Sequence, residues 1–262
     1  MKIIFSDIDG TLINDSLKIT PKTKQLILKQ IKNGNLFVPV SARSPLAMKT
    51  VVDQLGDVAC PIAAFNGALI LDEKGNEIYS KVLPIEEAKT IIREIATVKE
   101  VTWNVYSGLK WLTKKPKTAD LINEENIVGL KAYAVDLTEV ERLTEAHKTL
   151  VIGQPEILDK LMKTYQKRYP ELSLVKSKDT LLEIVAKGVD KGDSVKRVAE
   201  YYRVPLADTI AFGDNYNDET MLKMANKGYL MANAPEALKA SWPLITADHN
   251  HDGIAEVLEK VE

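Results

Sequence analysis

Short apolar runs alternate with helical patterns at both ends of this sequence, and this alternation constrains the fold more than any other feature. Near the N-terminus, apolar runs at residues 2–9, 36–41 and 62–65 are separated by helical patterns that begin at Thr20-Pro21 and Ser44-Pro45. A hydroxyl residue before Pro favours a helix start, because the hydroxyl caps free N–H groups and Pro fits the first turn. The order β-α-β-α-β predicts a parallel sheet with helices on its faces. The alternation resumes after residue 188, so the two ends predict one doubly wound, Rossmann-like α/β domain.

The middle of the chain follows a different pattern. A helical stripe at residues 85–95 precedes two strand-like runs between residues 101 and 113 that have hairpin spacing. Strands in hairpin spacing belong to an antiparallel sheet. We therefore expect an α+β domain at residues 83–187, inserted into an α/β core of residues 1–82 and 188–262. Each part is long enough for a hydrophobic core of its own.

The composition argues against several classes of function. Lys plus Arg total 35 and Asp plus Glu total 37, a formal net charge of -2 that gives no basic footprint for nucleic acid or anionic membrane. The single cysteine, Cys60, cannot form an internal disulfide, as expected in a reducing compartment. No apolar stretch reaches the roughly 20 residues of a membrane helix, and Asp7 interrupts the first apolar run before a signal peptide could form. We expect a cytoplasmic protein with no nucleic-acid or membrane partner, and the sequence leaves monomer and homodimer open.

Two acidic clusters follow predicted strands. Asp7 and Asp9 follow the first strand, and Asp214 and Asp218 follow a strand at residues 209–212. Side chains two residues apart in extended chain point the same way, and open α/β sheets bind ligands at the carboxyl ends of their strands. Either cluster alone is equally consistent with ordinary turn chemistry. Together they predict an all-oxygen site that suits Mg²⁺ better than zinc.

Anion-binding candidates lie between these clusters. Ser41 and Arg43 follow the second strand and precede the helix start at Ser44, whose free N–H groups favour an anion. Lys191 lies at another helix start. An ordinary cap and a solvated lysine are the alternatives for these residues taken singly. No dinucleotide fingerprint or Walker-type loop occurs in the sequence.

Other chemistry-bearing side chains have plainer interpretations. His249 and His251 resemble a metal pair, but no third ligand is evident and a solvated loop explains them better. Trp103, Tyr106 and Trp111 are expected in the core of the inserted domain's sheet. We assign none of these five residues to the site.

The ordered motifs resemble those of the haloacid dehalogenase superfamily, specifically the Cof-like phosphatases with a type IIB cap. The resemblance is carried by Asp-x-Asp-Gly-Thr at residues 7–11, Ser-Ala-Arg at 41–43, Asn-Gly-Ala at 66–68, Lys-Gly at 191–192 and Gly-Asp-x-x-Asn-Asp at 213–218. It spans the whole chain and implies a haloacid dehalogenase-like core with an inserted cap. The second motif usually reads Thr-Gly-Arg, so Ala42 replaces a glycine and its effect on activity is open. Pro39 is unexpected in a central strand, because it removes a ladder donor.

The resemblance also implies roles for individual residues. Asp7 would be the nucleophile that forms an aspartyl-phosphate, and Asp9 the general acid and then base, with Ser41 and Lys191 completing the catalytic set. Mg²⁺ would be held by the Asp7 carboxylate, the Asp9 backbone carbonyl and Asp214, with Asp218 nearby. The substrate-binding residues implied are Gly10, Ser41, Arg43, Asn66, Gly67, Lys191 and Asn217.

The function implied is that of a Mg²⁺-dependent phosphatase acting on small phosphorylated metabolites such as sugar phosphates. A phosphomutase is the nearest alternative, because related enzymes with similar caps use the same intermediate. Against it, the second motif reads Ser-Ala-Arg and not the mutase's Ser-Gly-Ser type. A non-catalytic phospholigand-binding module is a further alternative, disfavoured by the complete acidic set. The sequence specifies neither the physiological substrate nor which cap residues contact the leaving group.

Overall fold

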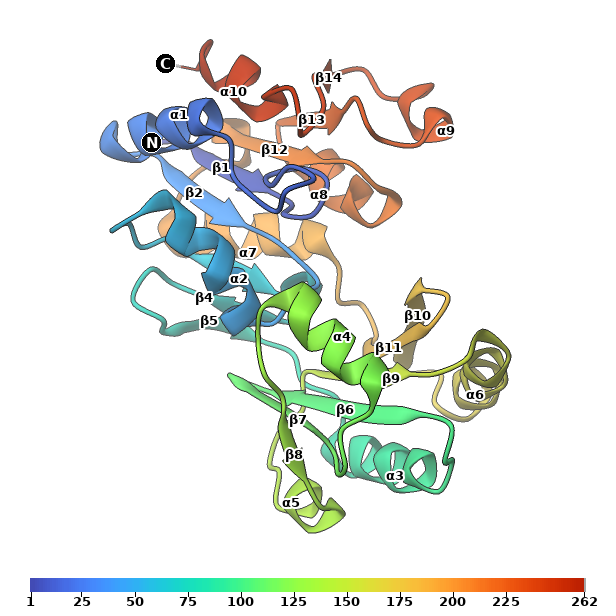
Figure 1. Ribbon diagram of the computed structural model, residues 1–262. Helices are drawn as coiled ribbons and strands as arrows, with labels where there is room; N and C mark the ends of the chain where they lie inside the picture. Colours follow the sequence, from blue (N-terminus) through green and yellow to red (C-terminus); the bar gives the residue numbers. More distant parts are fainter. Residues whose placement is uncertain (262) are drawn as a thin grey trace. The chain divides into compact units, whose positions relative to one another are not determined.

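The computed structural model describes residues 1–261 and divides the chain into two compact units. Unit 1 combines Met1–Ser80 with Asp190–Glu262, and unit 2 is Lys81–Val189. The order of elements along the chain is shown by the colours of Figure 1. Unit 1 contains two sheets and unit 2 contains one, and each unit has its own hydrophobic cluster. None of the helices described within residues 1–261 is long and apolar enough to cross a membrane.

Unit 1 is built on a five-stranded, wholly parallel sheet (Figure 1). In spatial order its strands are β14 (Ile245–Thr246), β13 (Lys227–Met231), β12 (Thr209–Gly213), β1 (Ile3–Ser6) and β2 (Leu36–Pro39). Strands β1 and β12 are fully buried, as expected for a sheet covered on both faces. Because all five strands are parallel, the loops that follow them meet at one edge.

Helices cover this sheet. The side chains of α7 (Lys191–Tyr202) and α8 (Glu219–Met224) pack with Ile3, Phe5 and Val38 in one buried cluster. Helix α1 (Pro21–Lys32) packs against α10 (Gly253–Leu258), where Gln30 donates to the carbonyl of Leu258. The remaining helical segments of unit 1 are α2 (Pro45–Val52), α9 (Glu236–Lys239), η1 (Asp53–Leu55), η2 (Phe65–Gly67), η3 (Leu206–Asp208) and η4 (Tyr216–Asp218).

The run predicted as a third parallel strand belongs to a different sheet. β3 (Ile62–Ala64), β4 (Leu69–Leu71) and β5 (Glu77–Ser80) form an antiparallel meander, linked to the parallel sheet by a single bridge between Val40 and Ala63. The bridge is parallel, so β3 has the predicted direction beside β2 but pairs with it at one position only. After β3, η2 turns the chain back through three residues with positive φ, and β4 therefore pairs antiparallel with β3.

The position of β2 in the sheet explains why Pro39 is tolerated in this strand. Strand β2 lies at the edge of the five-stranded sheet and pairs within it only with β1. A proline is tolerated on an edge strand, because its missing N–H costs no ladder bond on the open side. The expectation of a central strand at this position was therefore wrong.

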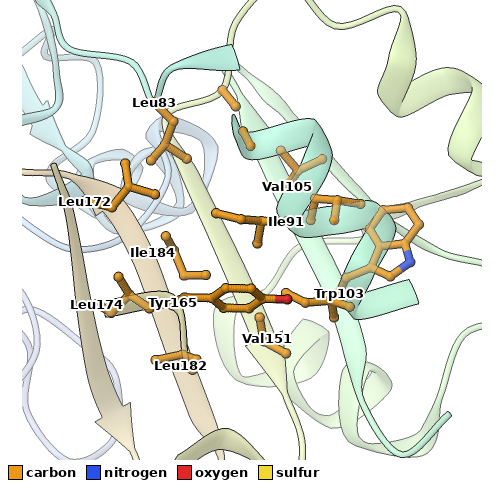
Figure 2. Close-up of a cluster of buried hydrophobic side chains, with 14 of the residues drawn as sticks. Leu83, Ile91, Trp103, Val105, Val151, Tyr165, Leu172, Leu174, Leu182 and Ile184 are labelled. Carbon is orange, nitrogen blue, oxygen red and sulfur yellow. The ribbon is translucent and has the colours of Figure 1, made fainter. Parts of the chain in front are cut away.

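Unit 2 contains a six-stranded sheet with helices packed against its hydrophobic cluster. In spatial order its strands are β10 (Leu172–Lys178), β11 (Leu181–Ala186), β9 (Lys148–Ile152), β6 (Thr102–Ser107), β7 (Lys110–Lys114) and β8 (Tyr133–Val135), antiparallel except for β7 with β8. Its helices are α3 (Ile85–Ala96), α4 (Ala119–Val128), α5 (Leu137–Glu141) and α6 (Pro155–Arg168). Figure 2 shows the ring of Tyr165 lying among Val151, Leu182 and Ile184 in the core. Trp103, Tyr106 and Trp111 are also buried, as expected.

Candidate active site

Three carboxylates gather at the carboxyl edge of the parallel sheet. Asp7 directly follows β1, and Asp214 and Asp218 follow β12. One oxygen of each lies within 4.8 Å of an oxygen of the other two. Asp7 and Asp218 are buried, and Asp214 is half-buried. The adjacent parallel strands β1 and β12 thus bring together residues that are about two hundred positions apart in the sequence.

Lys191 is the cation of this cluster. It is the first residue of α7, its side chain is 1% exposed, and its Nζ donates to Oδ1 of Asp7 at 2.7 Å and Oδ1 of Asp218 at 2.6 Å. Burial alone would lower the pKa of Lys191, but the charges of Asp7 and Asp218 and their hydrogen bonds raise it above its usual range. Lys191 therefore carries a positive charge among three acids.

One ammonium group does not balance three carboxylates. Burial, then the charge of Asp218, raises the pKa of Asp7 to about 8 despite the opposing effect of Lys191. Burial, again followed by Asp218, raises the pKa of Asp214 to about 6. The cluster thus lacks positive charge, which a hard divalent cation would supply. Its donors are all oxygens, so the residues present fit Mg²⁺.

Asp218 organises the loop that carries Asp214. Its Oδ2 accepts from the backbone N–H groups of Asp214 at 2.9 Å and Asn215 at 3.0 Å, while Oδ1 accepts from Lys191. Asn215 caps η4 in a capping box with Asp218. Both carboxylate oxygens of Asp218 therefore accept hydrogen bonds, and Asp218 stabilises the loop that carries Asp214. Asn217, from the same turn, is exposed.

The loop after β1 approaches Asp214 closely. Gly10 has φ of +77°, and a Cβ at this position would lie 2.5 Å from Oδ2 of Asp214, so only glycine fits. The hydroxyl of Thr11 donates to Oδ1 of Asp214 at 2.9 Å. Thr11 was not singled out from the sequence, although it is part of the first motif.

The Asp9 carboxylate lies apart from the cluster. It accepts two hydrogen bonds from Arg43, at 2.6 and 2.9 Å, and its side chain is 56% exposed. We expected the carboxylates of Asp7 and Asp9 to face one site because of the period of two in extended chain. Strand β1 ends at Ser6, before both acids, so that period does not continue through Asp9.

Ser41 and Asn66 lie side by side at the end of β2. The backbone N–H of Asn66 donates to the carbonyl of Ser41 at 2.8 Å, and the Ser41 hydroxyl accepts from the N–H of Arg43 at 3.2 Å. Oδ1 of Asn66 is buried without a hydrogen-bond partner. Gly67 has φ of +97° and packs against Ser194 of α7, whose Oγ would lie 2.3 Å from an added Cβ. Of the predicted phosphate-binding residues, Asn66 and Gly67 therefore share the η2 turn, and Ser41 lies against it.

His249 differs from the solvated residue expected from the sequence, because its side chain is only 13% exposed and its Nε2 pairs with Oδ1 of Asp15 at 2.9 Å. His251 is 76% exposed beside Asp248, as expected of a loop. The structure also brings Asn233 beside Asp214, a contact that sequence reasoning missed. A single Asn after a strand gives only the signal of a turn.

Comparison with known proteins gives a consistent picture. A family model described as haloacid dehalogenase-like hydrolase matches residues 4–258. A Haemophilus influenzae protein named as a putative phosphatase is 32% identical, and the alignment covers 99% of this chain and 97% of the relative.

Solved structures agree with this assignment of the fold. A haloacid dehalogenase-like hydrolase from Bacteroides thetaiotaomicron superposes with a TM-score of 0.92 at 25% identity, covering 100% of this chain and 99% of that one. The subclass IIB sugar phosphatase BT4131 superposes with a TM-score of 0.80 at 22% identity, covering 99% of this chain and 98% of that one. Both resemblances extend over both units of the chain.

Proposed function

Because this chain belongs to the haloacid dehalogenase-like hydrolases and is a phosphatase, we propose that it hydrolyses small phosphomonoesters with Mg²⁺ through an aspartyl-phosphate on Asp7. The observation that carries this proposal is the cluster of Asp7, Asp214, Asp218 and Lys191, of which all but Asp214 are buried. These side chains supply a carboxylate nucleophile, oxygen ligands for a cation and a fixed positive charge at one place. Covalent catalysis of this kind splits one difficult displacement into two easier ones.

We assign the metal site to the Asp7 carboxylate, the Asp9 backbone carbonyl and Asp214, with Asp218 supporting them. Mg²⁺ at this site would reduce the repulsion between an anionic nucleophile and an anionic ester and would stabilise charge on the transferring phosphoryl group. The raised pKa values of Asp7 and Asp214 are consistent with this assignment, since they reflect burial first and the neighbouring charge of Asp218 second.

In the first proposed step, an oxygen of Asp7 attacks phosphorus while the bond from phosphorus to the leaving oxygen breaks. Asp9 gives a proton to that oxygen, which requires Arg43 to release at least one Asp9 oxygen. In the second step, water attacks phosphorus, Asp9 accepts its proton, and phosphate leaves as the Asp7 carboxylate is restored. Lys191 holds Asp7 in place throughout.

The phosphate group would be bound by residues around the turn at the end of β2. Ser41 and Lys191 would donate to phosphate oxygens. Arg43, which lies beside Asp9, would attract the phosphate through its positive charge. The remaining proposed contacts are Gly10, Asn66, Gly67 and Asn217. The substrate is then a small phosphorylated metabolite, for which sugar phosphates are our first choice.

We further propose that residues 83–187 act as a cap that selects the leaving group. These residues fall within unit 2, which is compact and has a core of its own. Closure of such a domain would exclude water during the first step.

The test is a panel of phosphate esters assayed with Mg²⁺ for both inorganic phosphate and isomerised substrate. We expect free phosphate to accumulate over many turnovers without a bisphosphate activator. Isomerised sugar phosphate with negligible inorganic phosphate would identify a phosphomutase instead. Binding of esters without any turnover would identify a non-catalytic module.

A further inference from the structure

The side chain of Asn233 lies where four loops meet at the carboxyl edge of the parallel sheet. It follows β13, and its Nδ2 donates to the backbone carbonyl of Gly10 at 2.9 Å and to Oδ2 of Asp214 at 3.3 Å. Its Oδ1 accepts from the backbone N–H of His249 at 3.4 Å. One amide group therefore connects the loops that follow β1, β12 and β14 to the end of β13.

Asp214 is consequently held from two sides. Thr11 donates to its Oδ1 and Asn233 to its Oδ2. The carboxylate also packs against the backbone at Gly10, where an added Cβ would collide with it. Rotation of this carboxylate would break at least one of these contacts, so its orientation is set before any cation binds.

The loop of His249 and Asn250, which contacts Asn233, is held in place by hydrogen bonds to Asp15. Asp15 accepts from His249 Nε2 through Oδ1 and from Asn250 Nδ2 through Oδ2, both at 2.9 Å. The backbone N–H of Asp15 donates in return to Oδ1 of Asn250 at 3.1 Å. These hydrogen bonds hold the backbone N–H of His249 against Asn233. The side-chain amide of Asn233 is thereby fixed through both its oxygen and its nitrogen.

We propose that Asn233 is a positioning residue for the metal site, orienting Oδ2 of Asp214 and fixing the Gly10 loop beside it. The inference rests on the proposed function, because it takes Asp214 as a ligand of Mg²⁺. Groups that orient metal ligands commonly contribute a factor of about 10–100 to metal affinity. Asn233 acts through Asp214 and does not touch the proposed nucleophile, so its removal changes metal affinity more than the chemical step.

The experiment compares Asn233→Ala and Asn233→Leu with Asn226→Ala. Asn226 is a matched control at the opposite end of β13: it is also exposed and its Nδ2 also donates to a backbone carbonyl, that of Ala207 at 2.7 Å. Mg²⁺ affinity is measured by calorimetry without substrate, and the Mg²⁺ dependence of phosphate release is measured separately.

We expect Asn233→Ala to weaken Mg²⁺ binding by about 10–100-fold, with kcat recovering to within about threefold of wild type at saturating Mg²⁺. Asn233→Leu, which has nearly the same size but cannot donate and carries no charge, should weaken binding by a similar factor. Asn226→Ala should match wild type in both measurements.

Wild-type Mg²⁺ affinity in a folded Asn233→Ala or Asn233→Leu variant would overturn the proposal. A fall in kcat that excess Mg²⁺ does not restore, with unchanged affinity, would also overturn it. If the wild-type protein binds Mg²⁺ but releases no phosphate from any ester, the proposed function fails while calorimetry still decides the role of Asn233. The Leu variant, of similar size, keeps the test decisive if the Ala variant does not fold.

Discussion

At the scale of single residues, Lys191 shows how strongly the proposed site depends on charge balance. Its ammonium group is buried between Asp7 and Asp218. Replacing Lys191 with Met keeps much of the volume but leaves these acids without their cation. We expect Lys191→Met to lower the free energy of unfolding by about 3–5 kcal/mol and to abolish most activity.

The measurement is chemical denaturation at neutral pH without metal. The control is Lys196→Met on the same helix, whose side chain is 57% exposed and pairs with Glu200 only at 4.0 Å. Exposed pairs contribute little, so this control should change stability by less than about 1 kcal/mol. Equal stability of the two variants would contradict the importance assigned to Lys191.

The raised pKa values at the site predict that Mg²⁺ binding releases protons. With a pKa of about 8 for Asp7 and about 6 for Asp214, the metal-free protein holds a proton on Asp7 at pH 7. Metal ligation requires the carboxylate, so binding should release about one proton at pH 7, and Mg²⁺ affinity should rise with pH through this range. Calorimetry in buffers of different ionisation enthalpy measures the number released.

The release should disappear well above pH 8, where Asp7 is already ionised, and it should be smaller in Asp7→Asn. Proton uptake on Mg²⁺ binding at pH 7, or a heat independent of the buffer, would show that the carboxylates are ionised before the metal arrives.

The sequence predicted the position of a site residue where a strand end fixes it, and not where a turn or a contact between loops fixes it. Asp7, Asp214 and Asp218 lie close together as expected, because parallel strands place their carboxyl ends at one edge of the sheet. The position of the Asp9 carboxylate beside Arg43 depends on a turn, which residue spacing does not determine. The contact of Asn233 with Asp214 depends on how separate loops meet, and the sequence carries no local signal for it.

At the scale of elements, the η2 turn packs closely against helix α7 at Gly67. Gly67 has φ of +97°, and an added Cβ would collide with Ser194. Gly56 has φ of +99° with nothing within 4 Å of an added Cβ, so it isolates the backbone effect. We expect Gly56→Ala to cost about 1–2 kcal/mol and Gly67→Ala about 1–3 kcal/mol more.

Denaturant unfolding of the two variants measures this difference. Adding Ser194→Ala to Gly67→Ala should recover part of the loss, because it removes the colliding oxygen. Equal losses at Gly56 and Gly67, or no recovery in the double variant, would show that the turn moves away from α7 at little cost.

Element prediction succeeded where a local signal was strong. Thr20 and Ser44 cap α1 and α2, and each helix begins at the proline that follows. The third strand runs parallel to β2 as predicted, but it bridges β2 at one position and pairs mainly with β4, which the apolar run itself does not reveal. Helix α10 was not predicted from the sequence, because Asp252 and Gly253 at its N-terminal boundary are residues typical of turns.

At the scale of the whole molecule, unit 1 carries the proposed chemistry and unit 2 carries none of the proposed catalytic residues. We expect substrate choice to depend on unit 2. Replacing residues 83–187 with a related cap should redistribute kcat/KM among phosphate esters while Mg²⁺ dependence and the need for Asp7 persist. Substrate profiles of the parent and of a folded chimera measure this effect. An unchanged ranking would place specificity in unit 1.

The aspartyl-phosphate on Asp7 is the central claim, and the stereochemistry at phosphorus tests it most directly. A phosphorothioate monoester that carries two oxygen isotopes on phosphorus is hydrolysed with Mg²⁺ in water enriched in a third isotope, and the configuration of the inorganic thiophosphate product is determined. Two successive in-line displacements predict retention, and Asp7→Asn should reduce turnover by about a thousandfold or more because an amide cannot replace the nucleophile. Inversion at phosphorus, or steady turnover by a homogeneous Asp7→Asn preparation, would show that water attacks the substrate directly.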